Sequence, residues 1–197
     1  MTRHDALQQR LHPIDTPIGD LPLGGYRPDD VSRPRPAAVL VAVTDEDAPR
    51  ILLTVRAGHL SKHAGQVAFP GGGRDRPGET VVETALREAQ EETGLDPSAV
   101  RPVGLLGRYD TITGFRMTAV VGWIDPAFRP IPDRNEVDAV FSVALDHVRD
   151  PNAWRCDRVR WQERTFDILT LSHPEHRIWG ATAALLYDLG ERVGPGR

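Results

Sequence analysis

The chain is poor in lysine, cysteine and long apolar runs, and each shortage excludes a class of protein. Lys62 is the only lysine, so arginine supplies almost all of the positive charge. The single cysteine, Cys156, allows no internal disulfide, which suits a reducing compartment. No apolar run approaches the roughly 18 residues of a membrane-spanning helix, and the polar start lacks a signal-peptide core. We therefore expect a cytoplasmic protein with no membrane partner.

Positive net charge is also missing. The 197 residues carry a net charge of -4 at pH 7, which argues against a general nucleic-acid binder. An anionic small molecule would have to be met locally, by a bound cation or a few arginines. Hydrophobic residues make up 40% of the chain, which is enough for the core of one domain.

The apolar pattern predicts one folded domain behind a polar lead-in. Residues 1–36 carry prolines and aspartates without a sustained period, so we expect a loosely structured segment with a short helix near 6–11. Residues 37–192 form the predicted domain. Strands are expected at 37–43, 51–56, 67–69, 103–109, 117–124, 137–143 and 165–171, a tight turn at 70–73, and helices at 79–93 and 178–192. This mixture is typical of a layered α/β domain.

Three glutamates share one side of the first predicted helix. Glu88, Glu91 and Glu92 stand at i, i+3 and i+4, and Gly94 is well placed to end the helix. We expect their carboxylates to point away from the apolar stripe, which consists of Val82, Ala85, Leu86, Ala89 and Thr93.

Like charges at this spacing repel each other, so a divalent cation would stabilise the cluster. Carboxylate oxygens suit the hard ions Mg²⁺ and Mn²⁺. The alternative is a solvated acidic face, which is common on helices. The glycine-rich turn just before the helix favours the metal interpretation, because its free N–H groups can hold an anion. Metal carboxylates beside such a turn indicate phosphate chemistry.

The same residues resemble a known motif. Gly73, then Glu79 after five residues, then Arg87-Glu-Ala-Gln-Glu-Glu-Thr-Gly-Leu95 after seven more, look like the complete Nudix box. The resemblance implies an α/β/α sandwich with a mixed β-sheet, and hydrolysis of a nucleoside diphosphate linked to another group. It implies that Glu88, Glu91 and Glu92 hold the metal and take part in catalysis. Glu79 and Arg87 would brace the turn, although an ordinary i, i+4 pair of Arg87 with Glu83 or Glu91 is the alternative.

A second stretch resembles the coenzyme A pyrophosphatase branch of the Nudix hydrolases. It runs through Leu52-Leu-Thr-Val-Arg-Ala57 and Gly65-Gln-Val-Ala-Phe-Pro-Gly-Gly72, and the ending at 177–183 is similar too. Ser61 departs from this pattern, which has an arginine there. The resemblance implies a coenzyme A or acyl-CoA substrate. ADP-ribose, NADH or a nucleoside triphosphate is the alternative, and a non-catalytic binding module is a third.

Further side chains near the motif are candidates for the site. Arg56, Lys62 and His63, together with Gly72 and Gly73 of the turn, are predicted to bind the substrate, with simple solvent exposure as the alternative. His59 belongs to the same basic stretch. Glu136 precedes a predicted strand, and many Nudix enzymes bring another glutamate from a comparable loop, so it is a further catalytic candidate. The pattern does not indicate an oligomeric state.

Overall fold

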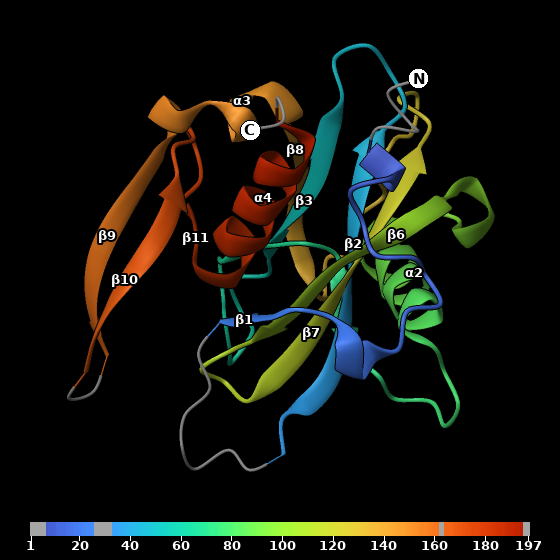
Figure 1. Cartoon of the computed structure of the whole chain (residues 1–197), viewed down its shortest axis with the longest axis horizontal. Coiled ribbons are helices and arrows are strands. Elements are labelled where there is room, and N and C mark those ends of the chain that lie inside the picture. Colours follow the sequence, from blue (N-terminus) through green and yellow to red (C-terminus); the bar gives the residue numbers. More distant parts are fainter. Residues whose placement is uncertain (1–6, 26–32, 162–163, 195–197) are drawn as a thin grey trace.

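A mixed eight-stranded sheet forms the centre of the protein (Figure 1). The computed structural model describes residues 7–25, 33–161 and 164–194. The strands are β1 (Leu23–Gly25), β2 (Arg35–Thr44), β3 (Arg50–Arg56), β4 (Val67–Ala68), β5 (Gly71–Gly73), β6 (Arg101–Asp110), β7 (Phe115–Ile124), β8 (Val137–Ala144), β9 (Trp154–Trp161), β10 (Arg164–Leu171) and β11 (Ile178–Trp179). The helices are α2 (Val81–Thr93), α3 (Leu145–Arg149) and α4 (Gly180–Val193), with single 3₁₀ turns at Ile18–Asp20, Pro97–Ala99 and Pro151–Ala153.

Strand order confirms the mixed sheet. Strands follow the order β1-β6-β7-β2-β3-β4, while β5 pairs with β2 and β8 pairs with β3. The β1–β6 and β2–β7 pairs are parallel, and the other pairs are antiparallel. β2 and β3 pair only at Val43 and Ile51, and beyond that point β4 pairs with β3 while β5 pairs with β2. A separate sheet has the order β11-β10-β9.

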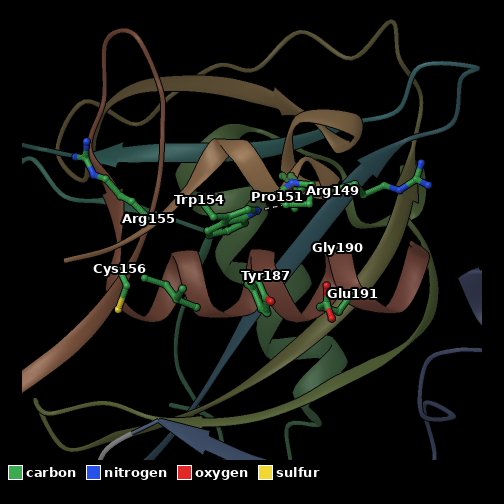
Figure 2. A pocket seen from close by; sticks show the side chains of 10 residues that line it. Arg149, Pro151, Trp154, Arg155, Cys156, Tyr187, Gly190 and Glu191 are labelled. Carbon is green, nitrogen blue, oxygen red and sulfur yellow. Dashed lines mark hydrogen bonds between the residues drawn. The ribbon is translucent and has the colours of Figure 1, made fainter. Parts of the chain in front are cut away.

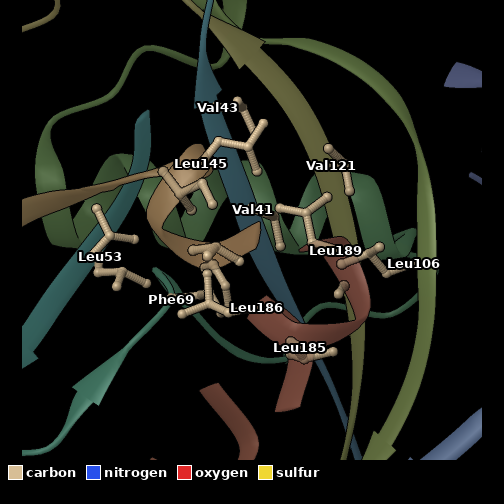
Figure 3. Packing of buried hydrophobic residues seen from close by; sticks show 14 of the residues in the cluster. Val41, Val43, Leu53, Phe69, Leu106, Val121, Leu145, Leu185, Leu186 and Leu189 are labelled. Atoms are coloured by element: carbon tan, nitrogen blue, oxygen red, sulfur yellow. The ribbon is translucent and has the colours of Figure 1, made fainter. Parts of the chain in front are cut away.

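Two apolar layers cover the two faces of the central sheet. On β2, Val41 and Val43 belong to the cluster that contains Leu186 and Leu189 of α4 (Figure 3). Ala42 lies between them and, like Leu40 just before them, belongs to the opposite cluster, which includes α2 residues. Alternate residues of a strand face opposite sides, so a continuous apolar run is what a strand buried on both faces requires. The α/β/α sandwich is confirmed.

Helix α2 has well-defined ends. Thr80 accepts a hydrogen bond from the N–H of Glu83, and the Glu83 carboxylate accepts one from the N–H of Thr80, which completes a capping box. Gly94 ends the helix in the left-handed region, at φ 71°. The helix therefore begins at Val81 and ends at Thr93, within two residues of the predicted 79–93.

The lead-in and the glycine turn differ from expectation. Within the predicted loose segment, residues 7 and 8 are helical, Leu7, Leu11 and Leu21 are buried, and β1 pairs with β6. Their apolar side chains are too widely spaced to show a period. Gly71–Gly73 is strand β5, because the strand lies close against β2: a Cβ on Gly71 would stand 2.4 Å from the carbonyl oxygen of Ala38. The boundary of the domain near residue 36 stays a prediction.

The C-terminal part contains elements that the pattern does not predict. The expected strand at 165–171 is confirmed as β10, and the expected helix at 178–192 is confirmed as α4 preceded by the short β11. Strand β9 was missed, because Arg155, Asp157 and Arg158 interrupt any apolar alternation. Helix α3 was also missed, since five residues are too few for a periodic signal.

Candidate active site

Arg87 holds the glycine strand against the glutamate helix. Its Nε donates to Glu79 Oε1 at 2.8 Å, and its Nη2 donates to the carbonyl oxygen of Gly73 at 3.1 Å. Its Nη1 donates to Glu88 Oε1 and to Glu91 Oε2, each at 2.8 Å. The hydrogen bond from Arg87 holds the pKa of Glu79 below its usual value. Arg87 therefore braces the glycine strand and also forms the i, i+4 pair with Glu91, because one guanidinium has enough donors for both roles.

Glu88 lies directly against β5. A Cβ placed on Gly72 would stand 2.4 Å from Glu88 Oε2 and 2.5 Å from its carboxyl carbon. Only glycine lets this strand approach the carboxylate so closely. Burial raises the pKa of Glu88, Arg87 opposes the rise, and the charges of Glu91 and Glu136 add to it. Gly72 and Gly73 thus contact the α2 carboxylates and Arg87, in addition to the substrate role predicted for them.

Glu92 corrects the predicted geometry of the cluster. Its side chain is 2% exposed, whereas that of Glu91 is 48% exposed, so the three carboxylates do not all point away from the core. Glu92 follows Ala85 by seven positions, nearly two full turns, which directs it toward the sheet. Arg56 Nη1 lies 3.7 Å from Glu92 Oε1. Burial raises the pKa of Glu92 to about 8, Arg56 opposes this, and Glu136 and Glu88 reinforce it.

A loop brings Glu136 to the same place. The N–H groups of Ile131 and Asp133 donate to the carbonyl oxygens of Thr93 and Glu92, which docks the loop on the end of α2. The carbonyl oxygen of Glu136 then accepts from the N–H of Ala57, next to Arg56. Glu136 itself is exposed, and its charge raises the pKa of both Glu88 and Glu92. The sequence predicted this glutamate but not the docking, which depends on backbone groups alone.

The remaining predicted residues lie on the connection from β3 to β4. Lys62 is exposed, and so is His59. His63 is half-buried, adopts a left-handed backbone at φ 59°, and its Nδ1 lies 2.9 Å from Gln66 Oε1. Asp138 fixes the start of this connection by accepting from the N–H of Gly58 at 2.8 Å. His63 therefore shapes the loop, and Asp138 is a supporting residue that the sequence pattern does not predict.

The carboxylates suit a hard cation. Glu92 Oε2 is buried and has no hydrogen-bond partner among the described residues. The charge of Glu136 raises the pKa of both Glu88 and Glu92, and all three side chains offer oxygen ligands. Across the described ranges no three His, Cys, Asp or Glu side chains are grouped as a complete metal site.

A pocket also opens elsewhere on the molecule. It has a volume of about 350 Å³ and is bordered by Trp154, Cys156 and Tyr187, from β9 and α4 (Figure 2). None of its lining residues belongs to α2 or to the β3–β5 segment.

Comparison with known proteins identifies the family. The NUDIX domain family matches residues 34–162. The chain is 37% identical over 163 residues to a protein of Pectobacterium atrosepticum named as an uncharacterized Nudix hydrolase, NudL, covering 83% of this chain and 85% of that one. A NudL of Salmonella paratyphi B is 39% identical over 160 residues, covering 81% and 83%. A solved Nudix hydrolase of M. smegmatis, RenU, is 27% identical with a TM-score of 0.47, over 58% of this chain and 73% of that one.

No helix in the described part of the chain has the length and apolarity needed to cross a membrane. The family match covers well over half of the chain, and the relatives match over most of their length. Nudix hydrolases act on small nucleotide-type substrates and generally use a divalent metal such as Mg²⁺ or Mn²⁺. The box residues that the sequence singled out surround one buried, carboxylate-rich place beside a glycine strand. The chain belongs to the Nudix family and is a hydrolase acting on a nucleotide-linked substrate.

Proposed function

We propose that this hydrolase cleaves the pyrophosphate bond of coenzyme A or acyl-CoA, giving 3′,5′-ADP and 4′-phosphopantetheine or its acyl form. One observation carries the proposal. The segment that resembles the coenzyme A branch, 52–72, is also the wall of the carboxylate site: β3 ends at Arg56 beside Glu92, and β5 packs on Glu88. Residues 52–72, which resemble that branch, would therefore contact the substrate next to the reacting phosphates.

Glu88, Glu91 and Glu92 are proposed to hold Mg²⁺ or Mn²⁺, which when bound neutralises charge on the pyrophosphate and lowers the pKa of a water molecule. Arg87 keeps Glu88 and Glu91 in place from the side of the glycine strand. Glu136, exposed at the rim, orients the attacking water and accepts its proton. The water oxygen bonds to one phosphorus, and the bridging oxygen leaves with the other phosphate. No covalent enzyme intermediate is required.

Arg56, Lys62 and His63 are proposed to meet the substrate's phosphates. Arg56 faces Glu92, so its substitution would also disturb the carboxylates. Lys62 is exposed on the loop and offers a cleaner test of binding to the 3′-phosphate. A charge-assisted contact contributes roughly 1.5–3 kcal/mol, or about 10- to 150-fold in affinity. Lys62→Ala should therefore raise KM for coenzyme A, leave kcat unchanged, and barely affect dephospho-coenzyme A.

A substrate panel tests the proposal. Coenzyme A, acetyl-CoA, ADP-ribose, NADH and nucleoside triphosphates are compared with Mg²⁺ and with Mn²⁺, and products are identified by mass spectrometry. Coenzyme A or acetyl-CoA should give the highest kcat/KM, and ¹⁸O from labelled water should enter one of the two product phosphates formed at the cleaved bond. If ADP-ribose or a triphosphate is the best substrate by tenfold or more, the coenzyme A proposal is wrong. Metal-dependent Nudix hydrolysis would then still hold.

A further inference from the structure

Strand β9 has one free edge. Among the described strands it pairs only with β10, and its outer side has no partner. Arg155, Cys156 and Arg158 are exposed along this strand. An eight-residue edge strand presents a row of backbone groups that another strand can pair with. Charged side chains are a common protection against such pairing, so their order along the strand decides whether a partner is accepted.

The hydrogen-bond pattern shows which backbone groups face outward. The N–H of Ser172 donates to the carbonyl oxygen of Ala153 at 2.9 Å, and these two residues extend the β9–β10 register by one pair. In an antiparallel ladder, hydrogen-bonded and non-hydrogen-bonded pairs alternate. Arg155 and Asp157 therefore direct their backbone groups toward β10. The even-numbered residues, Cys156 and Arg158 among them, direct theirs to the free edge.

A second copy of the same strand can pair there in few registers. In an antiparallel ladder, two directly opposed residues either both point their backbone groups at the partner strand or both point them away. When two identical strands pair about a twofold axis, one residue must therefore lie directly opposite the same residue of the other copy. We call that residue the centre of the register. A register centred on Arg155 or Arg158 places two arginines directly opposite each other, and one centred on Asp157 does the same with two aspartates. Centring on Val159 places Arg158 opposite Arg160. Like charges directly opposed are destabilising.

Centring on Cys156 differs from all of these registers. Arg155 of each copy then lies opposite Asp157 of the other, which gives two cross-strand pairs of opposite charge. Arg158 lies opposite Trp154, where a guanidinium can stack on the indole. Arg155 and Asp157 lie on one face of the strand, because Arg155 Nε is 3.4 Å from Asp157 Oδ1 within the same chain. We propose that this protein self-associates by antiparallel pairing of two β9 edges about a twofold axis at Cys156.

The neighbouring surface is continuous with this edge. Trp154, Arg155 and Cys156 also border the pocket of about 350 Å³, whose far side is Tyr187 on α4 (Figure 2). Tyr187 is 38% exposed and meets Trp154 edge-on, with ring centroids 5.3 Å apart. The second copy would thus extend its Arg158 over an apolar, aromatic rim. Aromatic residues next to arginine are typical of protein interfaces.

The single cysteine provides a test of the register. Directly opposed residues in a hydrogen-bonded pair have Cα atoms about 5.5 Å apart, within the range of a disulfide. Oxidation of the full chain with copper phenanthroline should therefore give a covalent dimer through Cys156. The matched control is Cys156→Ser with Arg158→Cys, which keeps one exposed cysteine on the same face. In the proposed register its two copies lie four residues apart, about 13 Å along the strand, which is too far to bridge.

Charge exchange tests the same pairing without a cysteine reaction. Sedimentation velocity should show a dimer for the native chain, and Arg155→Asp or Asp157→Arg alone should shift it to monomer. The double variant Arg155→Asp with Asp157→Arg restores opposite pairs and should restore the dimer, while thermal melting checks that each variant is folded. A native chain that stays monomeric overturns the proposal. So does crosslinking that is as fast in the control as at Cys156, or a double variant that stays monomeric although folded.

Discussion

Replacing Gly72 by alanine should inactivate the enzyme through Glu88. The new Cβ would stand 2.4 Å from Glu88 Oε2 and 2.7 Å from Oε1, so the carboxylate must move by roughly an ångström to reach ordinary contact. Arg87 resists this movement, because it holds Oε1 at 2.8 Å. Misplacing a reacting group by about 1 Å can cost on the order of 10²-fold in rate. We expect kcat to fall by about that factor.

Stability should fall as well, since added volume in a packed site costs about 1–3 kcal/mol. For a chain of this size, each kcal/mol lowers Tm by roughly 2–4 °C. Gly73→Ala is the matched control: its Cβ would meet the end of the flexible Asp75 side chain, with Oδ1 nearest at 3.1 Å, against 2.4 Å from Glu88 at Gly72. Neither glycine has a positive φ, so alanine fits both backbones. Alanine keeps the backbone N–H through which Gly73 is predicted to meet the substrate, so the control should keep near-native Tm and most activity.

A third variant separates the steric effect from other causes. Combining Gly72→Ala with Glu88→Ala removes the atoms that collide, so Tm should recover while activity stays lost. Calorimetry gives the coupling between the two sites as a double-mutant cycle. The reasoning is refuted if Gly72→Ala keeps native kcat, if Gly73→Ala is equally damaging, or if the double variant is no more stable than Gly72→Ala alone.

Three further predictions concern the charged groups. Glu92→Gln should reduce kcat by on the order of 10²-fold or more. It should also stabilise the protein in EDTA at pH 7, because the pKa of Glu92 is about 8 in the folded chain and 4.5 ordinarily, so ionisation favours the unfolded chain and glutamine removes that effect. Glu91→Gln, at a 48% exposed side chain, should do less in both assays. Equal effects would contradict the geometry. Glu79→Gln should cost about 1–3 kcal/mol at pH 7, since its hydrogen bond to Arg87 is charge-assisted. The pKa of Glu79 is lower in the folded chain than its ordinary value of 4.5. Its contribution to the free energy of unfolding is therefore complete above pH 4.5 and is lost as the pH falls through the folded pKa. Denaturation curves of the native protein and the variant should accordingly converge at acid pH. Arg87→Lys should impair both Tm and kcat, because one ammonium cannot bond Glu79, Gly73, Glu88 and Glu91 together.

The sequence predicted those parts of the fold that carry a strong local signal. The run at 37–43 and the stripe on α2 are apolar at the spacing their burial requires, and Gly94 ends the helix as expected. Strand β9 escaped prediction because both of its faces carry charged side chains. The packing of residues 7–25 escaped because it depends on contacts far along the chain, such as Arg108 donating to the carbonyl oxygen of Leu21.

The site was predictable in composition and less so in geometry. Spacing placed Glu88, Glu91 and Glu92 on one side of a helix, but it gave no sign that Glu92 lies beneath the surface opposite Arg56. That fact depends on how close α2 lies to the sheet. Glu136 was selected by resemblance, and its approach to Glu92 follows from the N–H of Asp133 donating to the Glu92 carbonyl oxygen. Side-chain chemistry can be inferred from spacing, whereas tertiary docking cannot.

The arrangement of charge explains why a chain with net charge -4 can hold a phosphate-rich substrate. The carboxylates that a metal would use are costly to bury and to keep close together: burial first, and then the neighbouring carboxylates, raises the pKa of Glu88 and Glu92. Arg87 and Arg56 offset that cost within the fold. Both arginines therefore contribute to stability and to the site at once, and their substitution cannot separate the two. Lys62, exposed on the connection from β3 to β4, is the cation whose removal should change substrate binding while leaving the fold intact.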